Sequence, residues 1–76
     1  MKQAMINWFD YTCGRGTVVL LDDLMSNRSK TYDFSYVNLT DKDMRLERGV
    51  IVNVEIYYDD IYGFEIVKTL SPKKGS

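Results

Sequence analysis

Short runs of β-branched and aromatic residues follow one another along the chain, and no segment repeats hydrophobic residues convincingly at the spacing of a helix. The clearest alternation is in Val50–Tyr58, where Asn53 and Glu55 are polar and their immediate neighbours are apolar. Turn-forming residues separate these runs from one another. The pattern predicts five short strands, which are Ala4–Asp10, Gly16–Asp22, Thr31–Tyr36, Val50–Tyr58 and Gly63–Leu70.

The segments between the predicted strands differ in length. Asp23–Ser29 is polar and is predicted to be a loop, and Asp59–Tyr62 is predicted to be a turn. The longest connection, Val37–Arg48, has room for one short helical turn. Five strands with a long connection between the third and the fourth are typical of an OB-type barrel. We therefore predict an all-β fold, a small five-stranded antiparallel OB-fold-like barrel.

A chain of 76 residues forms one domain at most. The barrel is predicted to occupy residues 1–71, and residues 72–76, from the only proline onward, are predicted to be a frayed C-terminal tail. Alternation assigns one face of each strand to the interior of the barrel. The predicted core consists of Ile6, Val18, Leu20, Phe34, Val52, Val54, Ile56 and Ile66.

The composition is that of a folded globular domain, with 45% hydrophobic and 28% charged residues. The net charge of -1 is not the basic footprint of a duplex-DNA binder, although a single-strand binder can rely on base stacking. One cysteine excludes an internal disulfide, and no apolar run approaches the roughly 20 residues of a membrane span. We expect a cytoplasmic protein that has no signal peptide and does not enter a membrane.

Residues that could catalyse a reaction or hold a metal are scarce. The chain has no histidine, which removes the most common general base and metal ligand. Cys13 is accompanied by neither a base nor a second cysteine. The pairs Asp22-Asp23, Asp41/Asp43 and Asp59-Asp60 are better explained as turn formers than as metal ligands. We expect no enzyme activity, no catalytic or metal-binding residue and no cofactor.

One segment of the chain, residues 8–18, reads W-F-D-Y-T-C-G-R-G-T-V, and a second segment, Lys30–Tyr36, reads K-T-Y-D-F-S-Y. The first resembles the motif W-F-N-x-x-K-G-F/Y-G-F-I of the bacterial cold-shock domain family, whose members are small OB barrels. Trp8, Phe9, Gly14 and Gly16 are in register with that motif. The second segment corresponds to the family's third strand, and a weaker similarity covers almost the whole chain.

The resemblance implies binding to unpaired RNA or DNA. Members of the family stack successive bases on exposed rings of their second and third strands. Carried over by position, the resemblance implies a binding face that contains Trp8, Phe9, Arg15 and Thr17, with Lys30 near the phosphate backbone. The planar guanidinium of Arg15 is able to stack on bases and to pair with phosphate.

Several positions depart from the family's pattern. The exposed rings of its second strand fall on Arg15 and Thr17, and the lysine before its first glycine falls on Cys13. The ring and the histidine of its third strand fall on Asp33 and Ser35, and a carboxylate at Asp33 repels phosphate. At least three stacking positions are lost. The resemblance therefore implies weak binding or an altered specificity.

A protein partner is the alternative. By alternation, Val19 and Leu21 share the outward side with Thr17, where apolar residues would form a contact surface. That surface would bind another protein, or the chain would form a homodimer by pairing exposed strand edges. Both hypotheses remain open from the sequence.

Two groups of residues have a structural explanation beside the functional one. Tyr57, Tyr58 and Tyr62 surround one predicted hairpin, and cross-strand packing explains them better than base stacking does. Gly14 and Gly16 either belong to the family motif or permit a bend in the barrel.

Overall fold

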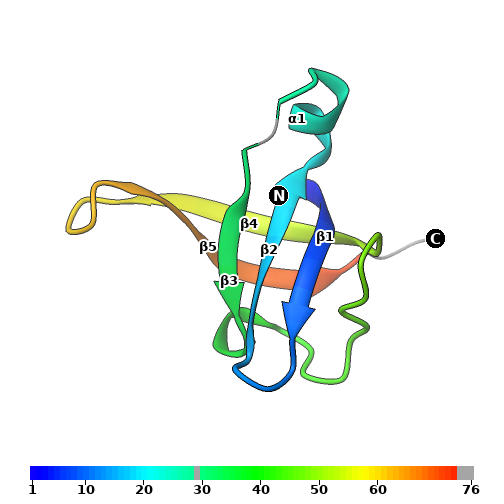
Figure 1. Cartoon of the computed structure of the whole chain (residues 1–76). Coiled ribbons are helices and arrows are strands. Elements are labelled where there is room, and N and C mark those ends of the chain that lie inside the picture. The colour runs from blue at the N-terminus through cyan, green and yellow to red at the C-terminus, as the bar shows by residue number, and fades with distance from the viewer. Residues whose placement is uncertain (29, 74–76) are drawn as a thin grey trace.

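The computed structural model describes residues 1–28 and 30–73 and contains five β-strands in a single antiparallel sheet (Figure 1). The strand order in the sheet is β3-β2-β1-β4-β5. This confirms the prediction of an all-β, five-stranded antiparallel fold. The elements are β1 (Lys2–Asp10), β2 (Arg15–Leu20), the α-helix α1 (Leu21–Met25), β3 (Tyr32–Ser35), the 3₁₀ helix η1 (Tyr36–Asn38), β4 (Ile51–Asp59) and β5 (Phe64–Pro72).

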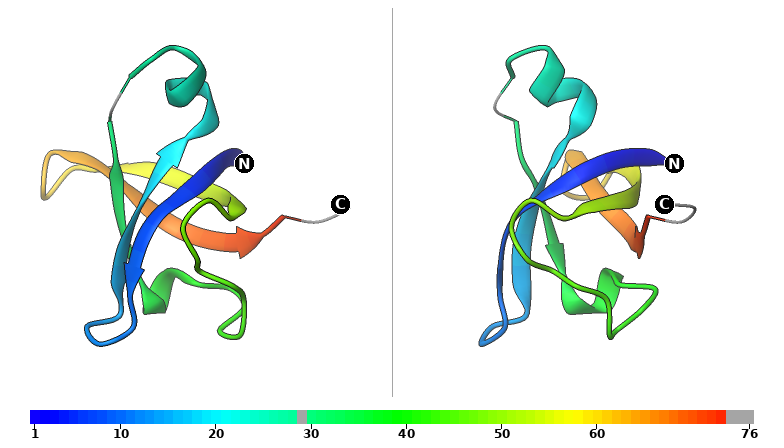
Figure 2. Two further views of the ribbon diagram at one scale, coloured as in Figure 1. Left: turned by 45° about the vertical axis from the view of Figure 1, so that its right-hand side comes forward. Right: turned by 90° about the vertical axis from the view of Figure 1, so that its right-hand side faces the viewer.

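The strands form two groups that cross each other. β1, β2 and β3 lie side by side, and β4 and β5 run across them at a steep angle (Figure 1 and Figure 2). β1 joins the two groups, because it pairs with β2 along most of its length and with β4 over Lys2–Met5. The core lies between the groups. The hairpin that connects β4 to β5 extends past β3 and projects from the body of the protein (Figure 1).

The sheet does not close into a barrel. Among the described residues no backbone ladder joins β3 to β5, so the predicted barrel is corrected to a sheet that is open at this seam. β3 is only four residues long, and the backbone N–H of its last residue, Ser35, donates to Oδ1 of Asn38 over 2.8 Å. Nδ2 of Asn38 donates to the Lys68 carbonyl of β5 over 3.3 Å. A side chain therefore bridges the seam where a barrel would have a strand pair.

Most of the predicted core is confirmed. Residues Ile6, Val18, Leu20, Phe34, Val52 and Val54 are buried in one cluster, against which Ile56 is partly buried. Ile66 is the exception, because the β4–β5 ladder shifts register and leaves Lys68 as an extra residue. The shift reverses the alternation, so that Val67 faces the core in place of Ile66. The cluster also contains Ala4, Tyr32, Leu39, Leu46 and Leu70.

The second strand is shorter than predicted. β2 ends at Leu20, and α1 replaces the rest of the predicted strand and part of the predicted loop. Asp22 and Asp23 lie in the first turn of this helix, where carboxylates are favoured by the helix dipole. Ser29 lies outside the described residues. No helix in residues 1–28 or 30–73 has the length and apolar character needed to cross a membrane.

The last strand is longer than predicted. Pro72 ends β5 and is paired with Val52, so it does not belong to a frayed tail. A proline is tolerated here because β5 is an edge strand. The remainder of the predicted tail, residues 74–76, lies outside the described part of the chain.

Replacing Val54 by alanine is expected to lower the free energy of unfolding by about 1–3 kcal/mol. Val54 is fully buried in β4 opposite Leu70, and the smaller side chain would leave a cavity. Urea unfolding followed by circular dichroism measures the change. Val37→Ala is the matched control, because Val37 is exposed and its truncation is expected to change stability by less than about 0.5 kcal/mol. Equal losses in the two variants would contradict the assignment of Val54 to the core.

Candidate functional site

A β-bulge in β1 turns the only tryptophan of the chain outward. The β1–β2 ladder shifts between Ile6 and Trp8, with Asn7 as the extra residue. Without this shift, the alternation that buries Ile6 would also point Trp8 into the core. Instead, 46% of Trp8 is exposed, and the next residue, Phe9, packs against the core. Nδ2 of Asn7 donates to Oγ1 of Thr17 over 3.2 Å, which ties the bulge to β2.

Trp8 begins a row of side chains across the outer face of β1, β2 and β3. It is paired with Thr17, and Thr17 is paired with Asp33 in the next strand. Because neighbouring strands lie about 4.8 Å apart, the Cα atoms of Trp8 and Asp33 are separated by roughly 10 Å. Only the small side chain of Thr17 lies between them. Two residues further along the same pair of strands, Arg15 lies opposite Ser35. The outer face therefore presents the Trp8 ring, the Arg15 guanidinium and the Asp33 carboxylate around a small residue, Thr17.

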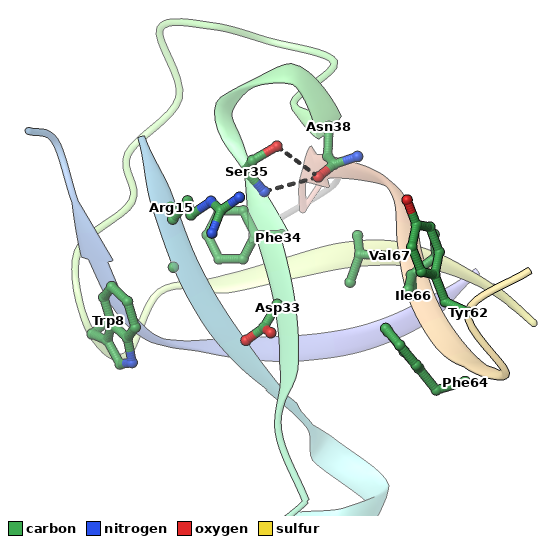
Figure 3. A pocket seen from close by; sticks show the side chains of 11 residues that line it. Trp8, Arg15, Asp33, Phe34, Ser35, Asn38, Tyr62, Phe64, Ile66 and Val67 are labelled. Atoms are coloured by element: carbon green, nitrogen blue, oxygen red, sulfur yellow. Dashed lines mark hydrogen bonds between the residues drawn. The ribbon is translucent and has the colours of Figure 1, made fainter. Parts of the chain in front are cut away.

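This face continues into a groove of about 650 Å³. The groove crosses the edge of β3 and reaches β5 along the seam where the sheet is open (Figure 3). Its volume lies within the range of about 300–1,000 Å³ that is usual for ligand sites. The residues that line it are Trp8, Arg15, Gly16, Asp33, Phe34, Ser35, Asn38, Tyr62, Phe64, Ile66 and Val67.

The far wall of the groove comes from the β4–β5 hairpin. Tyr62 and Phe64 line it, are exposed, and have ring centroids 5.9 Å apart (Figure 3). Tyr57, Tyr58 and Tyr62, for which the sequence predicts cross-strand packing, are all exposed, because the hairpin extends beyond the body (Figure 1). The groove thus has aromatic rings on both walls, with Trp8 opposite the pair from the hairpin.

Arg15 and Asp33 are the charged residues that line the groove. Both are exposed, and neither forms an ion pair within the described part of the chain. Lys30 lies outside the groove, with its ammonium 3.5 Å from Glu65 and 4.8 Å from the centre of the Tyr32 ring. The Tyr32 side chain, and to a lesser extent Glu65, raises the pKa of Lys30 above its usual value. Lys30 therefore links β3 to β5 and is not directed at the groove.

Four of the predicted site residues are buried or only partly exposed. The Phe9 ring stacks on Phe34, with the centroids 5.6 Å apart and the planes 17° from parallel. Thr17 is only 7% exposed, so a base has little access to it. Val19 is 8% exposed, and Leu21 begins α1, where the strand alternation that would set the two side by side has ended. The prediction of accessibility therefore fails for Val19, whereas Leu21 is partly exposed.

The fold itself explains why glycine occupies positions 14 and 16 of the family motif. Gly14 has a φ of 70° in the turn between β1 and β2, a conformation that favours glycine, and its N–H donates to the Asp10 carbonyl. A Cβ atom on Gly16 would lie 2.3 Å from the Trp8 carbonyl oxygen and 3.0 Å from the Phe34 ring. Because the fold requires both glycines, they do not by themselves support a binding function.

Three aspartates form turns, whereas Asp22 and Asp23, also predicted to form a turn, lie in α1. Asp10, Asp41 and Asp59 each accept a hydrogen bond from the backbone N–H two residues further on, over 2.8 to 2.9 Å. The N–H of Thr12 lowers the pKa of Asp10 in this way. Within residues 1–28 and 30–73, no three acidic or thiol side chains are grouped as metal ligands would be.

Comparison with known proteins assigns no family to the chain, because no family model and no curated protein matches it. The similarity to the cold-shock family therefore rests on the sequence register of Trp8, Phe9, Gly14 and Gly16. Of these four residues, Trp8 alone combines exposure with a place in the groove.

Proposed function

We propose that the chain binds single-stranded RNA or DNA in the groove between the outer face of β1–β3 and the β4–β5 hairpin. The observation that carries this proposal is one groove lined by three exposed rings, those of Trp8, Tyr62 and Phe64, and by the guanidinium of Arg15. Single-strand binders combine rings that stack on bases with cations that contact the backbone. Each stacked base contributes roughly 1–3 kcal/mol, whatever its sequence.

Two features limit the affinity and distinguish this groove from a strongly basic one. Asp33 lies on the same face as Arg15, and its carboxylate repels phosphate. The net charge of -1 also gives little long-range attraction for a polyanion. We therefore propose that stacking supplies most of the binding energy and that phosphate contacts supply the smaller part.

Fluorescence anisotropy with labelled oligothymidylate and oligouridylate of about eight nucleotides tests the proposal. Saturable binding is expected, and it should weaken as the salt concentration rises from about 50 to 200 mM. A flat titration with both oligonucleotides at low salt would contradict the proposal.

Replacing Arg15 by alanine is expected to weaken binding and to make its salt dependence shallower. If the guanidinium neutralises one phosphate, the slope of log K against log salt concentration should lose about 0.7. Arg48→Ala is the matched control, because Arg48 is exposed and lies outside the groove. A change of slope that is the same in both variants would show that Arg15 acts only through the net charge.

Binding of a protein is the second candidate, and the tip of the β4–β5 hairpin favours it. Ile61 is 89% exposed there, beside the exposed rings of Tyr58 and Tyr62. Exposed apolar residues at one projecting tip are a common feature of contact surfaces. This candidate would take first place if no oligonucleotide bound and sedimentation showed self-association that increased with protein concentration.

A further inference from the structure

We propose that Asp33 gives the groove a preference for guanine, by accepting two hydrogen bonds from the Watson–Crick edge of an unpaired base. This inference rests on the proposed function and specifies its ligand. Asp33 otherwise has no evident use in a groove for a polyanion, because its charge opposes binding. A carboxylate in a groove that binds nucleic acid is explained if it accepts hydrogen bonds from a base.

The surroundings of Asp33 leave its carboxylate available. Asp33 is exposed on β3, and within the described residues its side chain makes no hydrogen bond or ion pair. On one side of it lies the small side chain of Thr17, whose hydroxyl oxygen is already engaged by Asn7. Beyond Thr17, in the same row of paired residues, is Trp8, and Figure 3 shows Asp33 between Trp8 and Phe64.

The spacing of this row suits a base. Trp8 and Asp33 are two strands apart, with roughly 10 Å between their Cα atoms, and the small residue Thr17 lies between them. A base that stacks on the Trp8 ring could turn one edge toward β3. Asp33 and Ser35 are the polar residues of β3 that line the groove, and Asp33 is the one in the same row as Trp8.

The chemistry of the base edges selects guanine. An ionised carboxylate has two acceptor oxygens and no donor. Guanine presents two adjacent donors on its Watson–Crick edge, N1–H and the N2 amino group, which match these oxygens in a charge-assisted, two-bonded contact. Adenine and cytosine place an acceptor nitrogen beside their amino group, and uracil and thymine flank a single N–H with two carbonyls. In each of these bases at least one acceptor would face the carboxylate.

The test compares oligothymidylates of about eight nucleotides that carry one central substitution, either guanine or adenine. Both are purines with similar stacking area, so the ratio of their affinities isolates the edge contact. The wild-type chain is expected to bind the guanine oligonucleotide about 5- to 100-fold more tightly than the adenine one. Replacing guanine by hypoxanthine, which lacks the N2 amino group, should remove part of the preference.

Asp33→Asn keeps the shape of the side chain but replaces one acceptor with a donor, and it is expected to bring the guanine-to-adenine ratio to within about twofold. Asp43→Asn makes the same change at an exposed site outside the groove and should leave the ratio unchanged. A ratio near one in the wild-type chain, or a ratio that Asp33→Asn does not alter, would overturn this inference while oligonucleotide binding stands. If none of the oligonucleotides binds, the proposed function fails and the preference fails with it.

Discussion

Replacing Trp8 by alanine is expected to weaken the binding of oligothymidylate by roughly 5- to 150-fold, which corresponds to about 1–3 kcal/mol for one stacked base. The bulge at Asn7 turns Trp8 out of the core, so the substitution removes a ring from the groove without opening a cavity in the protein. Anisotropy of a labelled oligonucleotide measures the loss. Thermal unfolding of the variant separates a loss of binding from a loss of structure.

Tyr57→Ala is the control for this experiment. Tyr57 is 43% exposed, close to the 46% of Trp8, and it lies outside the groove. Its truncation removes a comparable exposed ring from another surface and should leave the affinity within about twofold. Equal affinity losses in the two variants would show that exposed rings contribute non-specifically. This result would contradict the assignment of the groove as the oligonucleotide-binding site.

Replacing Asp33 by phenylalanine is expected to strengthen the binding of oligothymidylate by roughly 5- to 150-fold. The substitution removes a negative charge that faces the phosphate backbone and adds a ring on which a further base can stack. Asp33 is exposed on the edge strand β3, so the larger side chain needs no space in the core. The same titration measures the gain, and thymine oligonucleotides keep it independent of any preference for guanine.

Asp33→Asn separates the two causes, because it removes the charge and adds no ring. Its gain in affinity for oligothymidylate should be smaller than that of Asp33→Phe. If the phenylalanine variant binds no more tightly than the wild-type chain, the outer face of β3 does not contact the nucleic acid. The site would then have to lie elsewhere on the surface.

The strands and most of the core could be predicted from sequence, because alternation reports directly which side chains share a face. Val52 and Val54 are examples, since both are fully buried in a segment of unbroken alternation. The same rule fails wherever one residue is inserted into a ladder. The extra Lys68 in β5 places Val67 in the core where alternation predicts Ile66. Nothing in the local sequence marks that insertion.

The open seam could not be predicted from the order of the strands. Closure of a five-stranded barrel needs a third strand long enough to pair with the fifth. Here β3 is only four residues long, and the Asn38 side chain accepts a hydrogen bond from the N–H of its last residue and donates one to the Lys68 carbonyl. An amide three residues beyond a strand is too common in sequences to indicate such a bridge.

The candidate site was only half visible in the sequence. Trp8 and Arg15 were found from their register, and both line the groove. Tyr62 and Phe64 were missed, because their role depends on how far the β4–β5 hairpin extends beyond the body, which is a property of the whole fold. The available signal was the density of aromatic residues between Tyr57 and Phe64.

The fluorescence of Trp8 during titration with unlabelled oligothymidylate tests the proposed site most directly. Trp8 is the only tryptophan of the chain, so its emission reports on one wall of the groove and on nothing else. The proposed site predicts quenching that saturates with added oligonucleotide and that is reduced at higher salt. Emission that stays constant under conditions where labelled oligonucleotide is bound would show that the nucleic acid lies elsewhere and would contradict the proposal.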